Sequence, residues 1–435
     1  MEKKVITRFA PSPTGHFHVG GIRGALYNFI FARQNGGTYI LRSEDTDKER
    51  SKKEYEDEFL EVFEWLGLKH DQFFRQSDRL IAHQKYLKKM IENGQAYVSK
   101  EIPKEESQRT EVIRFKNPNK KITFNDLILG EITVDTTDLG DFIIARDINE
   151  PLYHLTVVID DFEMGITHVI RGQEHTPNTP RQILIQEAIG ATRPIYAHLP
   201  LILNKERGKL SKRDPNVMPA IEYKNEGYLS EAVLNFMALN GWNPGGEEEI
   251  FTLNELIKKF DIKKVQKGGA IFNPEKLDWI NKEHIKKLPV GELQNKIFEW
   301  LPENMRNEKL IPIISERISK FGDIKKMVEA GELDFFFKQP EYSKDKLIYK
   351  NVSSEKISGN LKMAVEKLKE LSEKDFTKEK VKEVLMKVAD SLDSRGELLH
   401  PVRFSLSGLD KSPDPFIIAE ILGKNETLSR LQKAI

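Results

Sequence analysis

The sequence contains no cysteine among its 435 residues. This absence excludes disulfides and zinc sites built from thiolates, and it fits a reducing compartment. The sequence also has no apolar stretch long enough to cross a bilayer, and no apolar run follows the lysines of MEKKVITRF. Neither a membrane span nor a signal peptide is therefore expected, and we expect a cytoplasmic protein.

A net charge is also lacking, because Lys+Arg and Asp+Glu both total 68. The overall charge therefore gives no indication for or against nucleic acid, and only a local basic patch would do so. Hydrophobic residues make up 39% and charged residues 31%, which is typical of a charged globular protein. A chain of this length has room for about two to four domains.

The first hundred residues alternate between strand and helix patterns. We expect a strand at Val5–Ala10, a helix with apolar residues on one face over 22–33, and a second strand at Thr38–Arg42. Asn35-Gly36-Gly37 between them is a helix stop. This βαβ unit predicts two parallel strands, followed by helices over 47–66 and 77–93.

Residues from Tyr97 to Pro151 are more polar, with short strand-like pieces such as KKITFNDLILGEITVDTT, and we expect an insertion with its own small sheet. The apolar runs HLTVVIDD and ITHVIRG then predict two strands buried on both faces. A helix is expected over Pro180–Ile189, because Thr179–Gln182 has the T-x-x-Q spacing of a capping box. Beyond Asp214 the apolar spacing is helical throughout.

The stretch RFAPSPTGHFHVGGIRGALYNFIFAR, Arg8–Arg33, places prolines, glycines and two histidines between a predicted strand and a predicted helix. In a parallel sheet, ligands bind beyond the carboxyl ends of the strands. Arg8 ends the first strand, and Glu44 and Asp45 follow the second, so a cation and carboxylates meet at one edge and suit a zwitterion.

The turn within that stretch suits a phosphate. Gly20 and Gly21 allow a ligand to approach the backbone, and the helix start offers N–H groups and a partial positive charge. His16 and His18 add donors nearby. Taken alone, this turn is more often a structural feature than a nucleotide site.

A second motif, GKLSKR, occupies residues 208–213 after the apolar run HLPLILN. Lys209 and Lys212 flank Ser211 in a glycine-led loop, and lysine is a mobile point charge suited to phosphate. Alone it indicates an exposed basic turn. Together with the first motif it favours a nucleotide site.

The two motifs together resemble the HIGH and KMSKS motifs of class I aminoacyl-tRNA synthetases. A longer series of segments is similar to those of the bacterial-type glutamyl-tRNA synthetases and occurs in the same order. These segments are APSPTG–HVGG, LRSEDTD, VIDDFEMGITHVIRGQEH, NTPRQ, KLSKR, EAVLNFMALNGW, FNPEKLDWIN and HPVR…SP…ILGK. The resemblance covers nearly the whole chain.

The resemblance implies an α/β, Rossmann-like parallel-sheet catalytic domain with a small α+β insertion, followed by all-α stem and anticodon-binding domains. The corresponding boundaries are 1–97 and 151–213 for the catalytic domain, 98–150 for the acceptor-end-binding insertion, 214–287 for the stem-contact domain and 288–435 for the anticodon-binding region.

The implied activity is that of a glutamate–tRNA ligase. ATP with Mg²⁺ would convert L-glutamate to glutamyl-adenylate, and the glutamyl group would pass to the 3′ end of tRNA-Glu. A non-discriminating form that also charges tRNA-Gln is the open alternative. A monomer is expected.

The resemblance also assigns site residues. The catalytic set is His18, Lys209 and Lys212. The glutamate-binding set is Arg8, Ala10, Ser12, Glu44, Tyr153 and Arg171. The ATP-binding set is His16, His18, Gly20, Gly21, Glu174, His175, Lys209, Leu210, Ser211, Lys212 and Arg213. No residue is assigned to a resident metal, and the pair Asp160-Asp161 is either catalytic or structural, the structural role being favoured.

The sequence departs from the family pattern in places. The insertion Val98–Pro151 is short, and AYVSKEIPKEE stands where many relatives have a zinc-binding cysteine cluster, so no structural zinc is expected. Glu150-Pro151-Leu152 replaces a glycine-proline-threonine lead, and Gly21 stands where most class I enzymes have a second histidine.

Three rival functions are disfavoured by particular segments. A glutamyl-queuosine synthetase or a small-molecule nucleotidyltransferase would not need the helical Leu288–Ile435. A non-catalytic RNA-binding paralogue is expected to have lost His18, Lys209 and Lys212, which are present. Arg395 and Arg403 are candidate anticodon contacts.

Overall fold

The computed structural model describes residues 4–101, 110–210 and 217–435. The chain divides into two compact units, Met1–His284 and Ile285–Ile435. The first unit contains two buried apolar clusters, one on each side of a sheet, and the second unit has a cluster of its own.

In the described part of the first unit, a seven-stranded sheet has the order β3-β2-β1-β9-β10-β6-β7. Its strands are β1 Ile6–Phe9, β2 Thr38–Ser43, β3 Gln72–Arg75, β6 Lys121–Asp126, β7 Gly130–Asp135, β9 His168–Gly172 and β10 Ile195–Leu199. Neighbouring strands are parallel except β6 and β7, which form an antiparallel hairpin. The predicted parallel pairing of the first two strands is confirmed, with Arg8 opposite Ile40.

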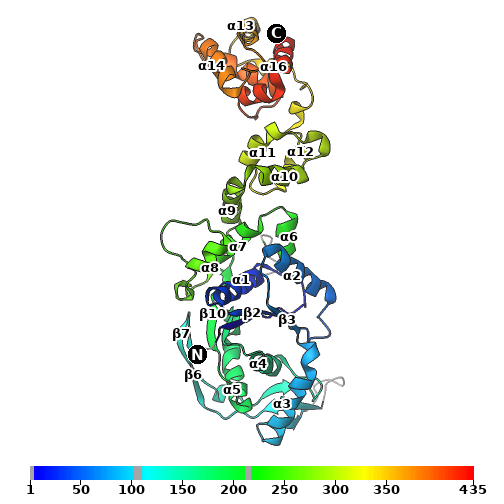
Figure 1. Ribbon diagram of the computed structural model, residues 1–435, viewed down its shortest axis with the longest axis vertical. Coiled ribbons are helices and arrows are strands. Elements are labelled where there is room, and N and C mark those ends of the chain that lie inside the picture. Colours follow the sequence, from blue (N-terminus) through cyan, green and yellow to red (C-terminus); the bar gives the residue numbers. More distant parts are fainter. Residues whose placement is uncertain (1–3, 102–109, 211–216) are drawn as a thin grey trace. The chain divides into compact units, whose positions relative to one another are not determined.

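Helices cover both faces of this sheet. α1 (Val19–Gln34) and α2 (Lys53–Leu66) contribute to the core on one face. α3 (Leu80–Glu92), α4 (Tyr153–Glu163) and α5 (Thr179–Ile189) contribute to the core on the other. Figure 1 shows α1 on one side of the sheet and α4 and α5 on the opposite side. This arrangement is the predicted α/β class.

The segment HLTVVIDD was predicted to be a buried strand, and this prediction is wrong. It lies in α4, where every residue from Leu155 to Asp161 is buried. A short apolar run does not distinguish a buried strand from a helix covered on nearly all sides, because neither shows a polar face. The helix begins after Pro151, with Leu152 as its N-cap.

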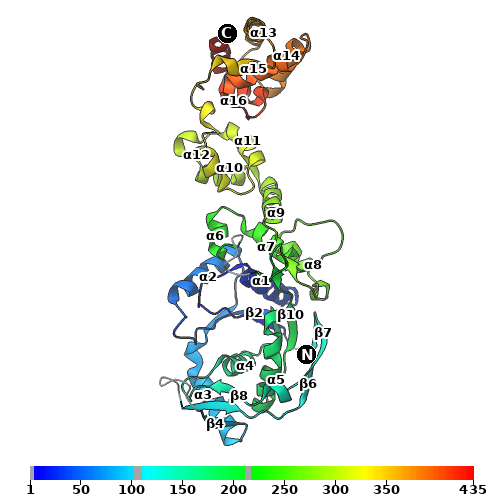
Figure 2. The same ribbon diagram turned by 180° about the vertical axis from the view of Figure 1, so that it is seen from behind.

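The insertion was expected to hold one small sheet, and it divides instead. β4 (Ala96–Lys100), β5 (Glu111–Phe115) and β8 (Phe142–Ala145) form a separate antiparallel sheet. The hairpin of β6 and β7 extends the main sheet through a pairing between β6 and β10. Figure 2 shows β4 and β8 beside α3, away from β6 and β7.

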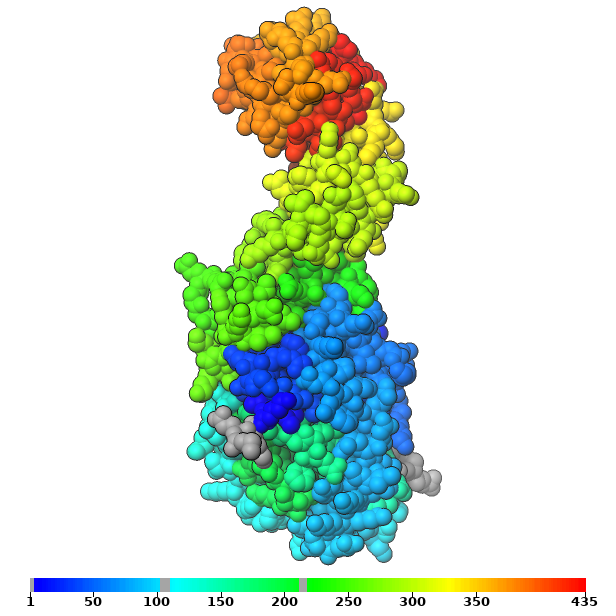
Figure 3. Space-filling model, viewed as in Figure 1, coloured from blue at the N-terminus to red at the C-terminus, as the bar shows by residue number. Residues whose placement is uncertain are grey.

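After the sheet, the described part of the first unit is helical apart from the short pair β11 (Ile202–Leu203) and β12 (Ala270–Ile271). Its helices are α6 Ala220–Asn225, α7 Ser230–Leu239, α8 Leu253–Lys259 and α9 Pro274–Lys287, which runs across the boundary between the units. α7 and α8 pack against α1, and Figure 3 shows this green segment beside the blue N-terminal region.

The second unit is helical, as predicted. Its α-helices are α10 Val290–Trp300, α11 Ile311–Arg317, α12 Asp323–Glu329, α13 Ser354–Lys369, α14 Lys378–Ala389, α15 Gly396–Ser407 and α16 Pro415–Ala434. α16 is interrupted at Gly423, whose φ of 79° is left-handed. Throughout the described residues, no helix is both long enough and apolar enough to span a membrane.

Candidate functional site

A cavity of about 770 Å³ opens at the carboxyl ends of β1 and β9. These two strands are neighbours, but the chain leaves them for opposite sides of the sheet, β1 toward β2 and β9 toward β10. Such a switch point is where doubly wound sheets bind ligands. Of the predicted site residues, the lining includes Arg8, Ala10, Ser12, His18, Gly20, Gly21, Glu44, Tyr153, Arg171, Glu174, His175, Lys209 and Leu210.

Arg8 is held by a carboxylate behind the cavity wall. Its Nε lies 3.1 Å from Oδ1 of Asp161, and both side chains are buried. Asp161 also accepts from Nη1 of Arg42 at 2.7 Å, so one carboxylate is shared by two guanidinium groups. Burial favours the neutral acid, but Arg8 and Arg42 outweigh it and hold the pKa of Asp161 below its usual value.

Glu44 lies beside the same network. Nη2 of the fully buried Arg42 donates to its Oε1 at 2.9 Å. Burial nevertheless raises the pKa of Glu44, against the attraction of Arg42 and Arg8. An additional cation at the cavity wall would favour the ionised form of this carboxyl group.

Arg171, at the end of β9, is a buried cation of a different kind. It is 8% exposed, and among the described residues no carboxylate lies within ion-pair distance of its guanidinium. Its Nε donates to Nε2 of His198 at 3.2 Å, and its Nη2 donates to Oγ1 of Thr179 at 2.7 Å. Burial lowers its pKa, but an arginine remains charged at neutral pH.

The role of Thr179 corrects the predicted capping box. The N-cap of α5 is Asn178, and no side chain caps this helix. Thr179 lies inside the helix, where its hydroxyl contacts Arg171 and His198 instead. A local spacing pattern could not reveal this tertiary partner.

Tyr153 and His175 lie next to each other in the cavity wall. The Tyr153 hydroxyl is 3.3 Å from Nδ1 of His175. Burial, with a contribution from the nearby Arg171, lowers the pKa of His175 to about 4. His175 is therefore a neutral ring at physiological pH and adds no positive charge beside Arg171.

The start of α1 forms the opposite wall. His18 is the N-cap, and its Nδ1 accepts from the Gly20 amide at 3.2 Å. A neutral His18 then carries its proton on Nε2, as a donor. No acidic residue occupies the first turn of α1, so the positive end of the helix dipole is not neutralised there.

Lys209 reaches the cavity from a tight turn. The backbone N–H of Gly208 donates to the side-chain Oδ1 of Asn204, and the backbone N–H of Asn204 donates to the carbonyl of Gly208. Arg207 within the turn has a φ of 63°. The turn brings Lys209 back opposite Leu203 of β11. Ser211, Lys212 and Arg213 lie outside the described residues, so their predicted ATP contacts remain predictions.

Some predicted residues are not brought to the cavity. His16 is exposed, and its Nδ1 lies 2.6 Å from Oε2 of Glu58. Asp45, which the sequence placed at the same edge, accepts from the backbone and hydroxyl of Ser77. Asp160 is a buried carboxylate on α4 that pairs with Arg79 and lies 2.8 Å from His83.

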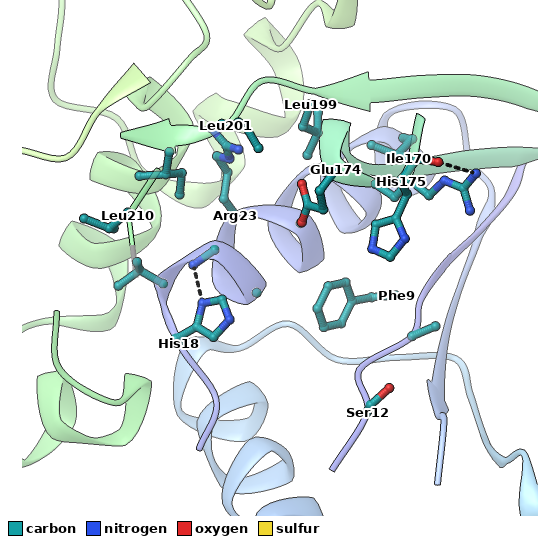
Figure 4. Close-up of a pocket in the computed structure, with 18 of the residues that line it drawn as sticks. Phe9, Ser12, His18, Arg23, Ile170, Glu174, His175, Leu199, Leu201 and Leu210 are labelled. Carbon is teal, nitrogen blue, oxygen red and sulfur yellow. Dashed lines mark hydrogen bonds between the residues drawn. The ribbon is translucent and has the colours of Figure 1, made fainter. Parts of the chain in front are cut away.

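Arg23 lines the cavity and was not predicted. It projects from α1, one turn after the glycines, and donates to the carbonyls of Asn240 and Pro200. Its buried Nε has no hydrogen-bond partner among the described residues. Figure 4 shows Arg23 and Glu174 on the same side of the cavity. The stretch GGIRG gives no periodic or spacing pattern that distinguishes a cavity-lining arginine from a surface one.

The lining therefore carries more positive than negative charge. It combines the cations Arg8, Arg23, Arg171 and Lys209 with the carboxylates Glu44 and Glu174. This excess suits a ligand set that brings several negative charges and one cation, such as a triphosphate together with an amino acid.

Known families match both units of the chain. The model described as tRNA synthetases class I (E and Q), catalytic domain, matches residues 4–110 and 100–279. The model described as anticodon binding domain matches residues 276–435.

Individual relatives match over the full length. The chain is 38% identical to a glutamate–tRNA ligase of Thermodesulfovibrio yellowstonii and 37% identical to one of Aquifex aeolicus, with 99% of each chain covered. A crystal structure of a glutamate tRNA ligase from Elizabethkingia meningosepticum in complex with its amino acid superposes with a TM-score of 0.87, at 33% identity and 99% coverage of both chains. The chain therefore belongs to the class I glutamyl-tRNA synthetase family.

Proposed function

We propose that this chain is a glutamate–tRNA ligase that performs both of its reaction steps at the cavity beyond β1 and β9. In the first step the α-carboxylate of L-glutamate attacks the α-phosphate of ATP, so that an acyl–phosphate bond forms and pyrophosphate leaves. In the second step a ribose hydroxyl at the 3′ end of tRNA-Glu attacks the acyl carbon, and AMP leaves. Full-length family membership supports this activity.

The observation that carries the proposal is the unpaired charge of Arg171. A buried cation without a counter-ion is costly, and a substrate carboxylate at the cavity wall would offset that cost. Arg8 differs, because Asp161 already compensates its charge. We therefore assign the side-chain carboxylate of glutamate to Arg171, whose planar donors favour a carboxylate over a neutral carboxamide.

Glu44 is proposed to hold the α-ammonium group. Burial raises its pKa in the unliganded cavity, and a bound ammonium would stabilise the carboxylate. Arg8, Ala10, Ser12 and Tyr153 complete the proposed amino-acid subsite, and all of them line the cavity.

ATP is proposed to lie along the opposite wall. The start of α1, with His18, Gly20 and Gly21, offers donors and a positive dipole to the phosphates. Lys209, with Lys212, is proposed to stabilise the charge that develops on the leaving pyrophosphate. Glu174, His175 and Leu210 are proposed to contact the nucleotide, and Ser211, Arg213 and His16 remain predicted ATP contacts. No covalent enzyme intermediate is required, so catalysis rests on positioning and charge stabilisation.

Mg²⁺ is proposed to enter with ATP. Among the described residues no group of three or more His, Cys, Asp or Glu side chains is placed to hold a metal ion. An ion that enters with ATP would be coordinated in large part by phosphate oxygens, and the chain's own contribution is the charge and shape of the cavity.

The remaining segments are proposed to bind the tRNA. We assign 98–150 to the acceptor end, 214–287 to the stem and 288–435 to the anticodon. Arg395 is exposed and paired with Asp390, whereas Arg403 donates to the Leu409 carbonyl and the Ser412 hydroxyl. We further propose a cytoplasmic monomer that charges tRNA-Glu, with charging of tRNA-Gln as the alternative.

Replacement of Arg171 tests the amino-acid subsite. Arg171→Ala is expected to raise the KM for glutamate about a hundredfold or more, because a charged hydrogen-bonding partner is lost. The KM for ATP is expected to stay within about threefold of the parent value, because ATP is proposed to bind along the opposite wall of the cavity. Arg193→Ala, which removes an exposed arginine paired with Glu187, is the matched control. An unchanged glutamate KM in a folded Arg171→Ala protein would contradict the assignment.

The choice of tRNA is tested by charging. Purified protein is supplied with glutamate, ATP and either tRNA-Glu or tRNA-Gln at one stated salt concentration, because phosphate contacts are salt-dependent. Charging of tRNA-Glu is expected. Failure to charge either tRNA would contradict the proposed function, and charging of both would identify the non-discriminating form.

A further inference from the structure

His198 is a fully buried histidine between the cavity and the hairpin of β6 and β7. It lies on β10, directly opposite Arg171 of β9 in the parallel pairing. Its Nδ1 is 2.7 Å from Oδ2 of Asp126, the last residue of β6. Neither His198 nor Asp126 is part of the cavity lining.

The chemistry of the partners fixes the tautomer of this ring. A guanidinium N–H can only donate, so Nε2 of His198 must be unprotonated to accept from Nε of Arg171. The proton of the neutral ring is then on Nδ1 and points at the Asp126 carboxylate. Burial lowers the pKa of His198 even though Asp126 acts in the opposite direction, which agrees with a neutral ring.

Asp126 is itself held in place. Its Oδ1 accepts from the backbone amides of Ile128 and Leu129, each at 2.9 Å, and its Oδ2 accepts from the backbone amide of His198 at 3.1 Å. Burial would raise its pKa, but these hydrogen bonds and the one with the His198 ring hold it below the usual value. The carboxylate therefore stays ionised and cannot turn away from the ring.

The guanidinium of Arg171 is fixed on two sides as a result. Its Nε donates to His198 and its Nη2 donates to Thr179, while the guanidinium carbon Cζ lies 5.8 Å from the centre of the Tyr196 ring. Nη2 also lies 3.5 Å from the backbone carbonyl oxygen of His175. All three polar partners are neutral acceptors, so they orient the group without neutralising its charge. In the described part of the chain no hydrogen-bond partner occupies Nη1.

We propose that Asp126 and His198 are positioning residues that orient the Arg171 guanidinium toward the carboxylate of the amino-acid substrate, and so help to select glutamate over glutamine. This inference rests on the proposed function, in which Arg171 receives that carboxylate. Asp126 acts by setting the tautomer of His198, and His198 acts by presenting Nε2 to Arg171.

The test compares three variants with the parent protein. His198→Phe keeps an aromatic ring at this position but removes both nitrogens. Asp126→Asn places an amide N–H against Nδ1 of His198 and so favours the tautomer that carries its proton on Nε2. Both are expected to raise the KM for glutamate about tenfold to a hundredfold, with the KM for ATP nearly unchanged. Both should also increase competition by glutamine. His198→Gln, which can place an oxygen near the position of Nε2, is expected to restore part of the affinity.

The matched control is His83→Phe. His83 is another buried histidine in contact with a carboxylate, with Nε2 at 2.8 Å from Oδ1 of Asp160, but it does not contact Arg171. This variant should lose a comparable amount of thermal stability while the two KM values stay close to those of the parent. The control therefore separates a loss of packing from a loss of orientation.

Particular results would overturn the inference. A folded His198→Phe or Asp126→Asn protein with the parent KM for glutamate would do so, as would equal rises in the KM for glutamate and for ATP. If His198→Phe does not fold, Asp126→Asn and His198→Gln decide by the same criteria. A parent protein that does not charge tRNA-Glu would instead contradict the proposed function, independently of the variants.

Discussion

Arg42 shows how single residues behind the cavity determine its geometry. Its guanidinium is fully buried and joins Asp161 at 2.7 Å and Glu44 at 2.9 Å. Taking these charges out of water is costly, but removal of one partner would leave the others uncompensated. Arg42 therefore fixes the relative position of the carboxylate that holds Arg8 and the carboxylate proposed to hold the ammonium group.

At the residue scale, the sequence predicted most of the cavity lining through its resemblance to a known family. Residues that act through other residues were harder to identify. The roles of Arg42, Asp126 and His198 depend on contacts between distant strands, such as the 72-residue separation between Asp126 and His198. For the pair Asp160-Asp161 a structural role was favoured over a catalytic one, and the ion pair of Asp161 with Arg8 agrees with that expectation.

His154 allows a prediction about pH and stability. Burial, helped by Arg181 and Arg171, lowers its pKa from 6.5 to about 4. The unfolded chain therefore binds a proton between pH 6.5 and pH 4 while the folded chain does not. The stability that His154 contributes is present above pH 6.5 and is lost as the pH falls toward 4, at a cost of about 2–3 kcal/mol.

His154→Phe removes this titration and suits the aromatic surroundings of Phe142 and Tyr153. Urea denaturation at pH 8 and at pH 4.5 is expected to show a smaller loss of unfolding free energy in the variant than in the parent. Some loss should persist, because burial also lowers the pKa of His175 to about 4. Identical pH dependence in both proteins would show that His154 titrates alike when folded and unfolded.

At the element scale, the first βαβ unit was predictable because its local patterns and its tertiary role agree. The strands β1 and β2 and the helix α1 follow the expected order, and α1 ends at the Asn35-Gly36 stop. α4 was not predicted correctly, because the surface that covers a segment is not specified by its local sequence. The strands β6 and β7 lie where strand-like pieces were expected, but the sheet that they join was not predicted, because the pairing of β6 with β10 connects distant segments of the chain.

The start of α1 gives a prediction at this scale. Replacing a glycine within a helix by alanine normally raises the free energy of unfolding by about 0.5–1 kcal/mol. At Gly21, however, a Cβ would lie 2.2 Å from Cε2 of Phe17, which is itself buried. Gly21→Ala is therefore expected to displace Phe17 and the first turn of α1, and to lower the melting temperature and raise the KM for ATP.

Gly359→Ala is the control for this prediction. Gly359 lies in α13, and a Cβ there meets no atom within 4 Å. This change is expected to raise the melting temperature slightly and to leave the KM for ATP unaltered. Equal behaviour of the two alanine variants would argue against a steric role for Gly21.

At the scale of the whole molecule, the two units have separate cores and separate tasks. The cavity and every residue in its lining belong to Met1–His284. The buried apolar cluster between Phe335 and Ala434 belongs to the second unit and includes none of the first unit's residues. We therefore expect local unfolding of the second unit to weaken tRNA recognition without dismantling the amino-acid and ATP subsites.

Arg430 is the residue with which to test this independence. It is 3% exposed, and its guanidinium donates to the backbone carbonyls of Phe335, Leu406 and Lys338, so it joins α16 to two other segments of the second unit. Arg430→Met would leave these carbonyls without their donor, at a cost of about 3 kcal/mol or more. Hydrogen exchange followed by mass spectrometry should show faster exchange in α13–α16 and unchanged exchange in α1 and the main sheet.

Arg395→Met is the control for hydrogen exchange. It removes an exposed ion pair with Asp390 and should leave exchange unchanged in both units, because such pairs contribute little. In charging assays, the Arg430→Met protein should show a raised KM for tRNA and an unchanged KM for ATP. Hydrogen exchange that rises equally in both units would show instead that the two units unfold together.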